Sequence, residues 1–389
     1  MNHTRISLAA VLTAAVSAGL LGAAPAGAET RPRPVPVPLD GFVSVASFGG
    51  IAATPMPVAL DAVRADELWI AMRDTDGRLA MHRAKGAGAR VDRTQRLSVN
   101  AAPGDPVVVD GSGGEAWLSA SGSLWRLASG TWRQVSTGVA AGSAPTVTTV
   151  ADAPGRGAYV GLSQFDERTA RNRSWVAWTD GRTWRALPGG PGQVDGKDPI
   201  TSGRDLTPQV NRIRVAGGQV FAEWRTDSVS VTDEVFAYAG GKWRSIYPGG
   251  FVFPYGAMHV KAWLVPTAQR HLQLGEVYSG SHREDAHHIE GFAQTWTPRT
   301  GIQRGETTGL VGAAAVLANG STIIGNNAYK GEVTSLPSGF VLRSVSGKET
   351  PVRGDAGSET LAMTSAAGTN TAWALTRNGE TIQLQRYKS

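Results

Sequence analysis

The chain has 389 residues, a formal net charge of +6 and no cysteine. The lack of cysteine excludes a disulfide framework, thiol catalysis, a cysteine-ligated zinc or iron–sulfur site and a lipid-modified N-terminal cysteine. A hydrophobic fraction of 41% excludes global disorder. The 12 tryptophans and 49 glycines favour short strands and tight turns over helices.

The first 28 residues read as a cleaved signal peptide. Arg5 precedes an apolar run over residues 6–21, and Ala26-Gly27-Ala28 forms a small-x-small cleavage site. The apolar run is short for a membrane span, so an uncleaved anchor is the less favoured alternative. These features predict a secreted, extracellular protein without a membrane span. The richness in Ala, Gly and Arg favours a bacterial source.

Residues 29–39 form a proline-rich leader, with prolines alternating over positions 32–38. Alternating prolines hold a backbone extended and remove amide donors, so this segment is expected to be a stiff spacer outside any sheet.

Residues 40–389 show no sustained helical periodicity but short alternating runs separated by turn residues, as in all-β proteins. A repeat is visible in these runs. Each unit ends in a strand after a glycine-containing turn, most clearly at Trp132-Arg133, Trp184-Arg185 and Trp243-Arg244. Further upstream in each unit lies a strand with a large apolar anchor, at Trp69, Trp117, Tyr159, Phe221, Trp263, Ile323 or Trp373.

Four strands per unit of roughly 50 residues predict one seven-bladed β-propeller. The predicted blades span residues 55–99, 104–138, 144–189, 205–249, 251–309, 310–354 and 358–389. The last blade has only three visible strands, and the alternating segment 42–48 has no partner of its own. Pairing the two would close the ring and satisfy both edges. Rings of six or eight blades remain alternatives because the blade lengths differ.

The repeats resemble secreted bacterial β-propellers, and more weakly the tryptophan-rich, tachylectin-like propeller lectins. The resemblance rests on Asp76-Gly77-Arg78-Leu79, on Ser121-Gly122-Ser123-Leu124-Trp125 and on the strands that start at Trp184 and Trp243 and end in Gly-Gly. It implies recognition of extracellular or cell-wall glycans. Separately, Thr179-Asp180-Gly181-Arg182-Thr183-Trp184 resembles the aspartate box of sialidase-type propellers, which is a structural turn and not an active site.

Most tryptophans are expected to fill the interfaces between blades, because buried aromatic side chains dominate core energetics. Trp178 is the best candidate for an exposed platform that stacks on a sugar ring. It follows Trp175 on one predicted strand and lies beside a turn.

Five of the seven histidines fall in the predicted fifth blade. His282, His287 and His288 are candidate ligands for a divalent metal, although adjacent histidines on one strand face opposite sides. No other cofactor is expected. A solvated polar loop is the favoured alternative for this segment. The wider set of candidate ligand-binding residues is Trp178, His259, His271, His282, Arg283 and Glu290.

The sequence favours a non-catalytic, monomeric binding protein that recognises glycans. One alternative is a propeller lyase or hydrolase, with or without a metal, that uses the histidine-rich hairpin of the fifth blade. Another is a protein-interaction platform. Nucleic acid is excluded as a partner because the small excess of Lys and Arg is dispersed along the chain.

Overall fold

The computed structural model describes residues 41–48, 58–64, 66–74, 76–86, 88–102, 105–137, 144–166, 171–190, 209–226, 232–247, 257–278, 289–330, 335–336, 338–354, 357 and 359–388. All of them belong to the compact unit Val37–Ser389, while the other unit, Met1–Pro36, lies outside the described residues. The predicted signal peptide and the predicted leader both lie outside the described residues. Among the described residues, no helix is long and apolar enough to cross a bilayer.

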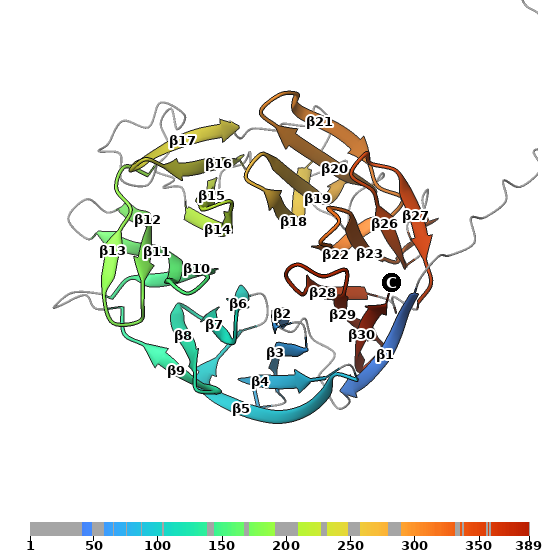
Figure 1. Ribbon diagram of the computed structural model, residues 1–389, viewed down its shortest axis with the longest axis horizontal. Coiled ribbons are helices and arrows are strands. Elements are labelled where there is room, and N and C mark those ends of the chain that lie inside the picture. Colours follow the sequence, from blue (N-terminus) through green and yellow to red (C-terminus); the bar gives the residue numbers. More distant parts are fainter. Residues whose placement is uncertain are drawn as a thin grey trace, which may run out of the picture. The chain divides into compact units, whose positions relative to one another are not determined.

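Seven four-stranded antiparallel sheets follow one another around a ring (Figure 1). The first three blades are β2 (Val58–Arg64) to β5 (Arg90–Asn100), β6 (Val107–Ser112) to β9 (Thr131–Val135), and β10 (Thr146–Ala153) to β13 (Trp184–Ala186). Inside them lie β3 (Glu67–Arg73), β4 (Arg78–Lys85), β7 (Glu115–Ala120), β8 (Ser123–Ala128), β11 (Gly157–Asp166) and β12 (Arg171–Thr179).

The fourth blade comprises β14 (Gln209–Ala216), β15 (Gln219–Thr226), β16 (Thr232–Ala239) and β17 (Lys242–Tyr247). The fifth comprises β18 (Ala257–Thr267), β19 (Arg270–Tyr278), β20 (Ile289–Thr297) and β21 (Gly301–Glu306). The sixth comprises β22 (Leu310–Val316), β23 (Thr322–Asn327), β26 (Gly339–Arg343) and β27 (Glu349–Val352). The predicted all-β, seven-bladed propeller is confirmed, and rings of six or eight blades are excluded.

The seventh blade joins the two ends of the propeller. It contains β28 (Glu359–Ser365), β29 (Ala372–Asn378) and β30 (Thr381–Lys388), and β1 (Gly41–Phe48) pairs with β30 as its outer strand. Phe42 of β1 stacks on Phe340 of the sixth blade, with ring centroids 3.9 Å apart. The amide of Phe42 also donates to the carbonyl of Arg353, 2.7 Å away. The predicted closure by an N-terminal strand is therefore present, and β1 also ties the seventh blade to the sixth.

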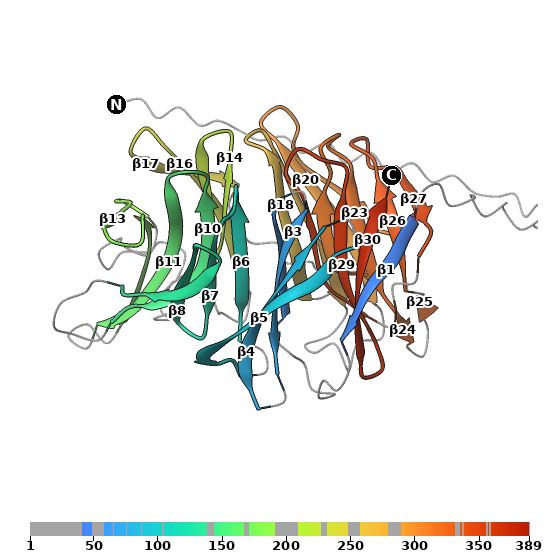
Figure 2. The same cartoon turned by 60° about the horizontal axis from the view of Figure 1, so that its bottom comes forward.

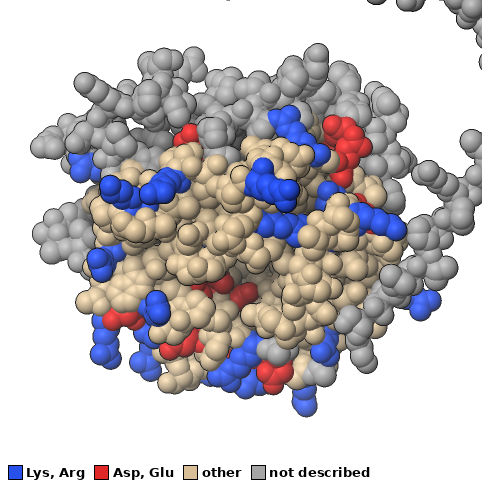
Figure 3. Space-filling view, turned by 45° about the horizontal axis from the view of Figure 1, so that its top comes forward, with Lys and Arg blue, Asp and Glu red and all other residues tan. Residues whose placement is uncertain are grey.

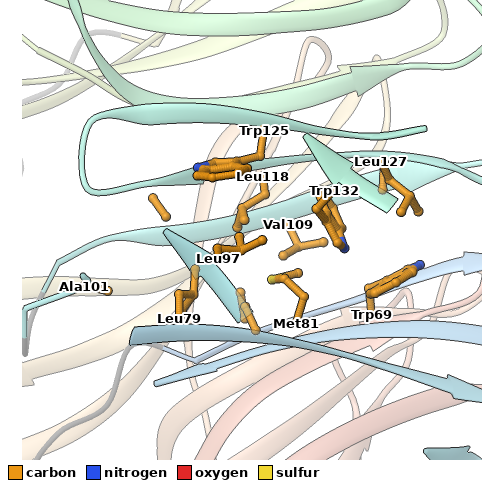
Figure 4. Packing of buried hydrophobic residues seen from close by; sticks show 14 of the residues in the cluster. Trp69, Leu79, Met81, Leu97, Ala101, Val109, Leu118, Trp125, Leu127 and Trp132 are labelled. Carbon is orange, nitrogen blue, oxygen red and sulfur yellow. The ribbon is translucent and has the colours of Figure 1, made fainter. Parts of the chain in front are cut away.

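Large side chains from facing blades fill the spaces between them. Figure 4 shows the first and second blades, where Trp69 of β3 meets Trp132 of β9 edge to face at 5.4 Å. Both indoles are buried, together with Met81 and Leu118. Since each blade buries apolar area against two neighbours, ring closure replaces the disulfides that this chain lacks.

The fifth blade departs from the sequence prediction. Trp263, expected on the second strand, lies on the first strand, β18, which is long and carries two bulges. Leu272 holds the second-strand position of Trp69 or Phe221 and packs toward the sixth blade. The preceding residue, His271, instead faces Phe221 of the fourth blade and pairs in register with Trp296 of the third strand. The sixth blade carries a further two-stranded sheet that the repeat did not indicate. Figure 2 shows it below β26 and β27; it consists of β24 (Tyr329–Lys330) and β25 (Ser335–Leu336).

The first six blades turn back on themselves twice at the same face of the ring, and the seventh does so once, between β28 and β29. The connections between first and second strands, and between third and fourth strands, all end there because the strands are antiparallel. We call this the tight-turn face. Nearly all of its turns belong to the described part of the chain, and many have glycines in the left-handed region, such as Gly113, Gly155 and Gly217.

Candidate functional site

Three aspartates come together on the first strands of neighbouring blades, near the tight-turn face. Figure 1 shows these strands nearest the centre of the ring. Asp61 lies on β2, Asp110 on β6 and Asp152 on β10. Asp61 pairs in register with Trp69, and Asp110 pairs with Trp117. Opposite residues of an antiparallel pair point to the same side, so each carboxyl group enters the same inter-blade space as its tryptophan. We call these three residues the axial carboxyl cluster.

Hydrogen bonds connect the axial carboxyl cluster across the blades. The hydroxyl of Thr364, on β28, donates to Asp61 Oδ1 at 3.0 Å, and the amide of Gly111 donates to Asp61 Oδ2 at 2.8 Å. The amide of Asp152 donates to Asp110 Oδ2 at 3.2 Å. The Ser112 hydroxyl donates back to Asp152 Oδ2 at 2.5 Å. These contacts join the seventh, first, second and third blades in sequence.

Arg214, on β14, is the cation that acts electrostatically on the cluster. Its Nε donates to the carbonyl of Trp263 at 3.2 Å and its Nη1 to the carbonyl of Ile213 at 3.0 Å. Burial lowers the pKa of Arg214, and the charge of Asp110 opposes that shift. Within the described part of the chain, no Lys or Arg forms an ion pair with any of the three aspartates.

All three carboxyl groups hold protons more tightly than an ordinary aspartate. Burial and then the charge of Asp110 raise the pKa of Asp61 well above its usual value, against the hydrogen bond from Thr364. Burial raises the pKa of Asp110, and Arg214 counteracts part of this. Burial raises the pKa of Asp152 to about 7, although the Ser112 hydrogen bond opposes it.

Figure 3 shows a hollow in the middle of one face with acidic side chains at its bottom, while basic and other acidic residues lie farther out on that face. No group of three or more histidines, aspartates and glutamates in the described ranges is arranged to hold a metal ion. The carboxyl groups of the axial cluster instead bond to hydroxyl and amide donors of the protein itself.

A second buried polar group lies between the fourth and fifth blades. Glu223 of β15 is fully buried and accepts from Arg212 Nη1 at 3.2 Å and from Asn211 Nδ2 at 3.1 Å. Arg212 Nη2 also donates to the carbonyl of Val260 at 2.9 Å. This ion pair therefore joins two blades in the same way as the axial cluster does on the other side of the ring.

The candidate residues from the sequence do not form one site. Trp178 is half-buried and packs against the core between the third and fourth blades. His259 is exposed on β18, whereas Glu290 is half-buried on β20. His271 is 1% exposed, and neither ring nitrogen has a hydrogen-bond partner in the described part of the chain. The predicted metal ligands and Arg283 lie outside the described residues: His282, Arg283, His287 and His288.

The tryptophans are mainly structural. Seven of the twelve are buried and five are half-buried, so none is exposed. The aspartate-box-like segment is a structural turn: Asp180 Oδ1 accepts from the amides of Arg182 and Thr183 at 2.8 and 2.7 Å. These hydrogen bonds lower the pKa of Asp180 to about 2.

The sequence analysis did not identify the axial carboxyl cluster. The sequence pattern that marks Asp61 and Asp110 is an acidic residue in a short, otherwise largely apolar strand. This strand directly precedes the strand with the aromatic anchor in the same blade. In the structure, Asp61, Asp110 and Arg214 are the register partners of Trp69, Trp117 and Phe221. A bulge in β2 adds one residue between Asp61 and Trp69, so spacing in the sequence does not align the three positions.

Comparison with known proteins supports the fold and no family. No family model and no curated protein matches the sequence. The solved structure of the Cps50 (Swd1) β-propeller domain of Myceliophteria thermophila is similar at TM-score 0.51 and 12% identity, over 86% of this chain and 98% of that one. YCF48 bound to D1 peptide is similar at TM-score 0.53 and 10% identity, over 91% and 97%. At such low identity, these similarities establish that the chain has a β-propeller fold.

Proposed function

We propose that this protein is a protein-interaction platform that binds its partner across the tight-turn face. The observation that carries the proposal is a set of hydrogen bonds between neighbouring blades that hold the turns of this face in fixed positions. Arg126 Nη1 donates to the carbonyl of Asp180 at 2.7 Å, and Arg64 Nη2 donates to that of Gly113 at 3.3 Å. Arg270 Nη1 donates to the carbonyl of Gly320 at 3.2 Å.

Hydrogen bonds also connect the β22–β23 turn of the sixth blade to the β28–β29 turn of the seventh blade. The amide of Ala318 donates to the carbonyl of Thr369 at 2.9 Å, and that of Asn319 donates to Asn370 Oδ1 at 3.3 Å. A surface whose loops are already ordered loses little conformational entropy on binding. Such preorganisation suits a broad face that recognises another folded protein or an ordered peptide.

Peptide binding has a precedent among similar folds, since the YCF48 structure contains a D1 peptide. Glycan recognition, which the tryptophan content favoured, has less support because no tryptophan is exposed for stacking on sugar rings. The lyase or hydrolase hypothesis has less support from His271, which is enclosed by aromatic side chains instead of facing solvent.

A position-specific photo-crosslinking experiment tests this proposal. A photoreactive amino acid replaces Arg156, exposed in the β10–β11 turn of the tight-turn face, or Arg133, exposed on the outer strand β9 as the control. We expect a discrete crosslinked protein from position 156 and none from position 133. The charge reversal Arg156→Glu should weaken binding of that partner at least tenfold, while Arg133→Glu leaves it unchanged.

Crosslinks formed only at position 133, or equal effects of the two charge reversals, would contradict the proposal. Binding to a glycan array that persists without any protein partner would favour the glycan alternative instead.

We further propose that the protein is exported as a monomer after cleavage behind Ala28. This rests on the basic, apolar and small-residue segments at the N-terminus. Intact-mass analysis of protein from the culture medium should find a chain that begins at Glu29, and light scattering should give the mass of one chain. A protein that retains residues 1–28 inside the cell, or a dimer mass, would overturn the corresponding part.

A further inference from the structure

The axial carboxyl cluster lies where the ring closes. Through Thr364, Asp61 contacts the seventh blade, which contains both the N-terminal strand β1 and the C-terminal strand β30. Through Gly111 it contacts the second blade, and Asp110 and Asp152 continue the contacts to the third. The inner strands β22 and β18, across the ring, carry no aspartate or glutamate. Among the described residues, the linked aspartates of the inner strands therefore lie on the first, second and third blades, and Asp61 joins them to the seventh blade.

Few charges are available to compensate this cluster. The groups that act on it are Arg214 from β14 and Glu115 from β7, besides the aspartates themselves. Arg212 and Glu223 act on Arg214, with opposite sign. From β28 the cluster meets the neutral hydroxyl of Thr364, and from β3 the apolar ring of Trp69. Among the described residues, one partly compensating arginine thus faces three carboxyl groups, and like charges in a desolvated site repel strongly.

We propose that the axial carboxyl cluster is a proton-dependent latch that holds the first, second, third and seventh blades together at the closure of the ring. With protons bound, the carboxyl oxygens accept the hydrogen bonds that connect the inner strands without accumulating negative charge. When the protons leave, the remaining negative charges repel one another and weaken contacts between these four blades. The far side of the ring, joined through Arg212 and Glu223, does not share this response.

The sign of the effect follows from proton linkage. The pKa values of the three aspartates are raised in the folded state, so the folded protein binds more protons than the unfolded chain above the ordinary aspartate value of 3.8. The stability contributed by these groups is therefore complete at low pH and decreases as pH rises. For Asp152 the loss is largely complete above about pH 7, and for Asp61 it continues beyond the ordinary aspartate range.

The test compares the pH dependence of unfolding in three chains. Between pH 5 and pH 9 the unfolding midpoint of the wild type should fall by about 3 °C or more relative to that of Asp61→Asn/Asp152→Asn, which retains the same His271. Asp61→Asn/Asp152→Asn, which imitates the protonated side chains, should lose much less over the same range. Asp92→Asn is the matched control: Asp92 pairs with Arg83 at 2.8 Å on the surface and its pKa is lowered, so its slope should equal the wild-type slope.

Two measurements keep the proposal falsifiable if the double variant does not fold. Infrared spectra of the wild type at pH 6 should contain a protonated carboxyl band that disappears at alkaline pH. Amide exchange, corrected for its intrinsic pH dependence, should accelerate in β2, β6 and β10 but not in β22. A missing carboxyl band, uniform acceleration around the ring, or equal slopes for wild type and double variant would each overturn the latch.

Discussion

At the residue scale, His271 is the least usual side chain in the core. It contacts Phe221 edge to face at 4.6 Å and Trp296 at 5.0 Å, and Trp263 lies at 6.0 Å. Burial lowers its pKa to about 4 because the apolar surroundings disfavour an imidazolium. The space between the fourth and fifth blades thus contains a buried titratable group without a hydrogen-bond partner in the described part of the chain.

The consequence is a stability loss in acid. Folded His271 stays neutral down to about pH 4, whereas the unfolded imidazole takes up a proton below its ordinary value of 6.5. Stability should therefore fall between pH 6.5 and pH 4, by up to about 3 kcal/mol. His271→Phe should remove this loss in denaturant unfolding followed by circular dichroism. His259→Gln, at an exposed position, is the control, and an equal acid loss in wild type and His271→Phe would refute the assignment.

At the element scale, β1 carries a core side chain and a solvent-facing one next to each other. Phe42 is 5% exposed and stacks on Phe340, while Val43 is 53% exposed. Phe42→Ala should cost about 3–5 kcal/mol because it leaves a cavity at the closing blade. Val43→Ala should change stability by less than about 0.5 kcal/mol. Equal losses for the two variants in chemical denaturation would show that β1 does not pack as described.

The β10–β11 turn offers a matched pair of glycines. Gly155 and Gly157 have φ values of 66° and 103°, but only Gly157 is crowded. A Cβ there would lie 2.0 Å from the carbonyl oxygen of Thr179, whereas none of the surrounding atoms comes within 4 Å at Gly155. Gly157→Ala should cost more than about 3 kcal/mol, and Gly155→Ala only about 1 kcal/mol. Thermal unfolding of both variants checks this, and the reverse order would contradict it.

At the scale of the whole molecule, the architecture was predictable from sequence and the axial carboxyl cluster was not. Turn glycines and alternating apolar residues mark each strand locally, and the unpaired segment around Phe42 indicated how the ring closes. Asp61 and Asp110 lie 49 residues apart, and their meeting depends on strand register. The first strand β18, which carries Trp263, likewise has bulges that shift its register with β19. Composition and spacing do not reveal such bulges.

Every functional inference for this protein depends on one closed ring, because closure positions the tight-turn face and the axial carboxyl cluster together. Hydrogen exchange of the intact protein, read peptide by peptide, tests closure most directly. Those amides of β1 that pair with β30 over Gly41 to Phe48 should be protected to the same degree as the amides of β30. A β1 that exchanges at the rate of an unstructured chain, while β28–β30 remain protected, would contradict the closed ring.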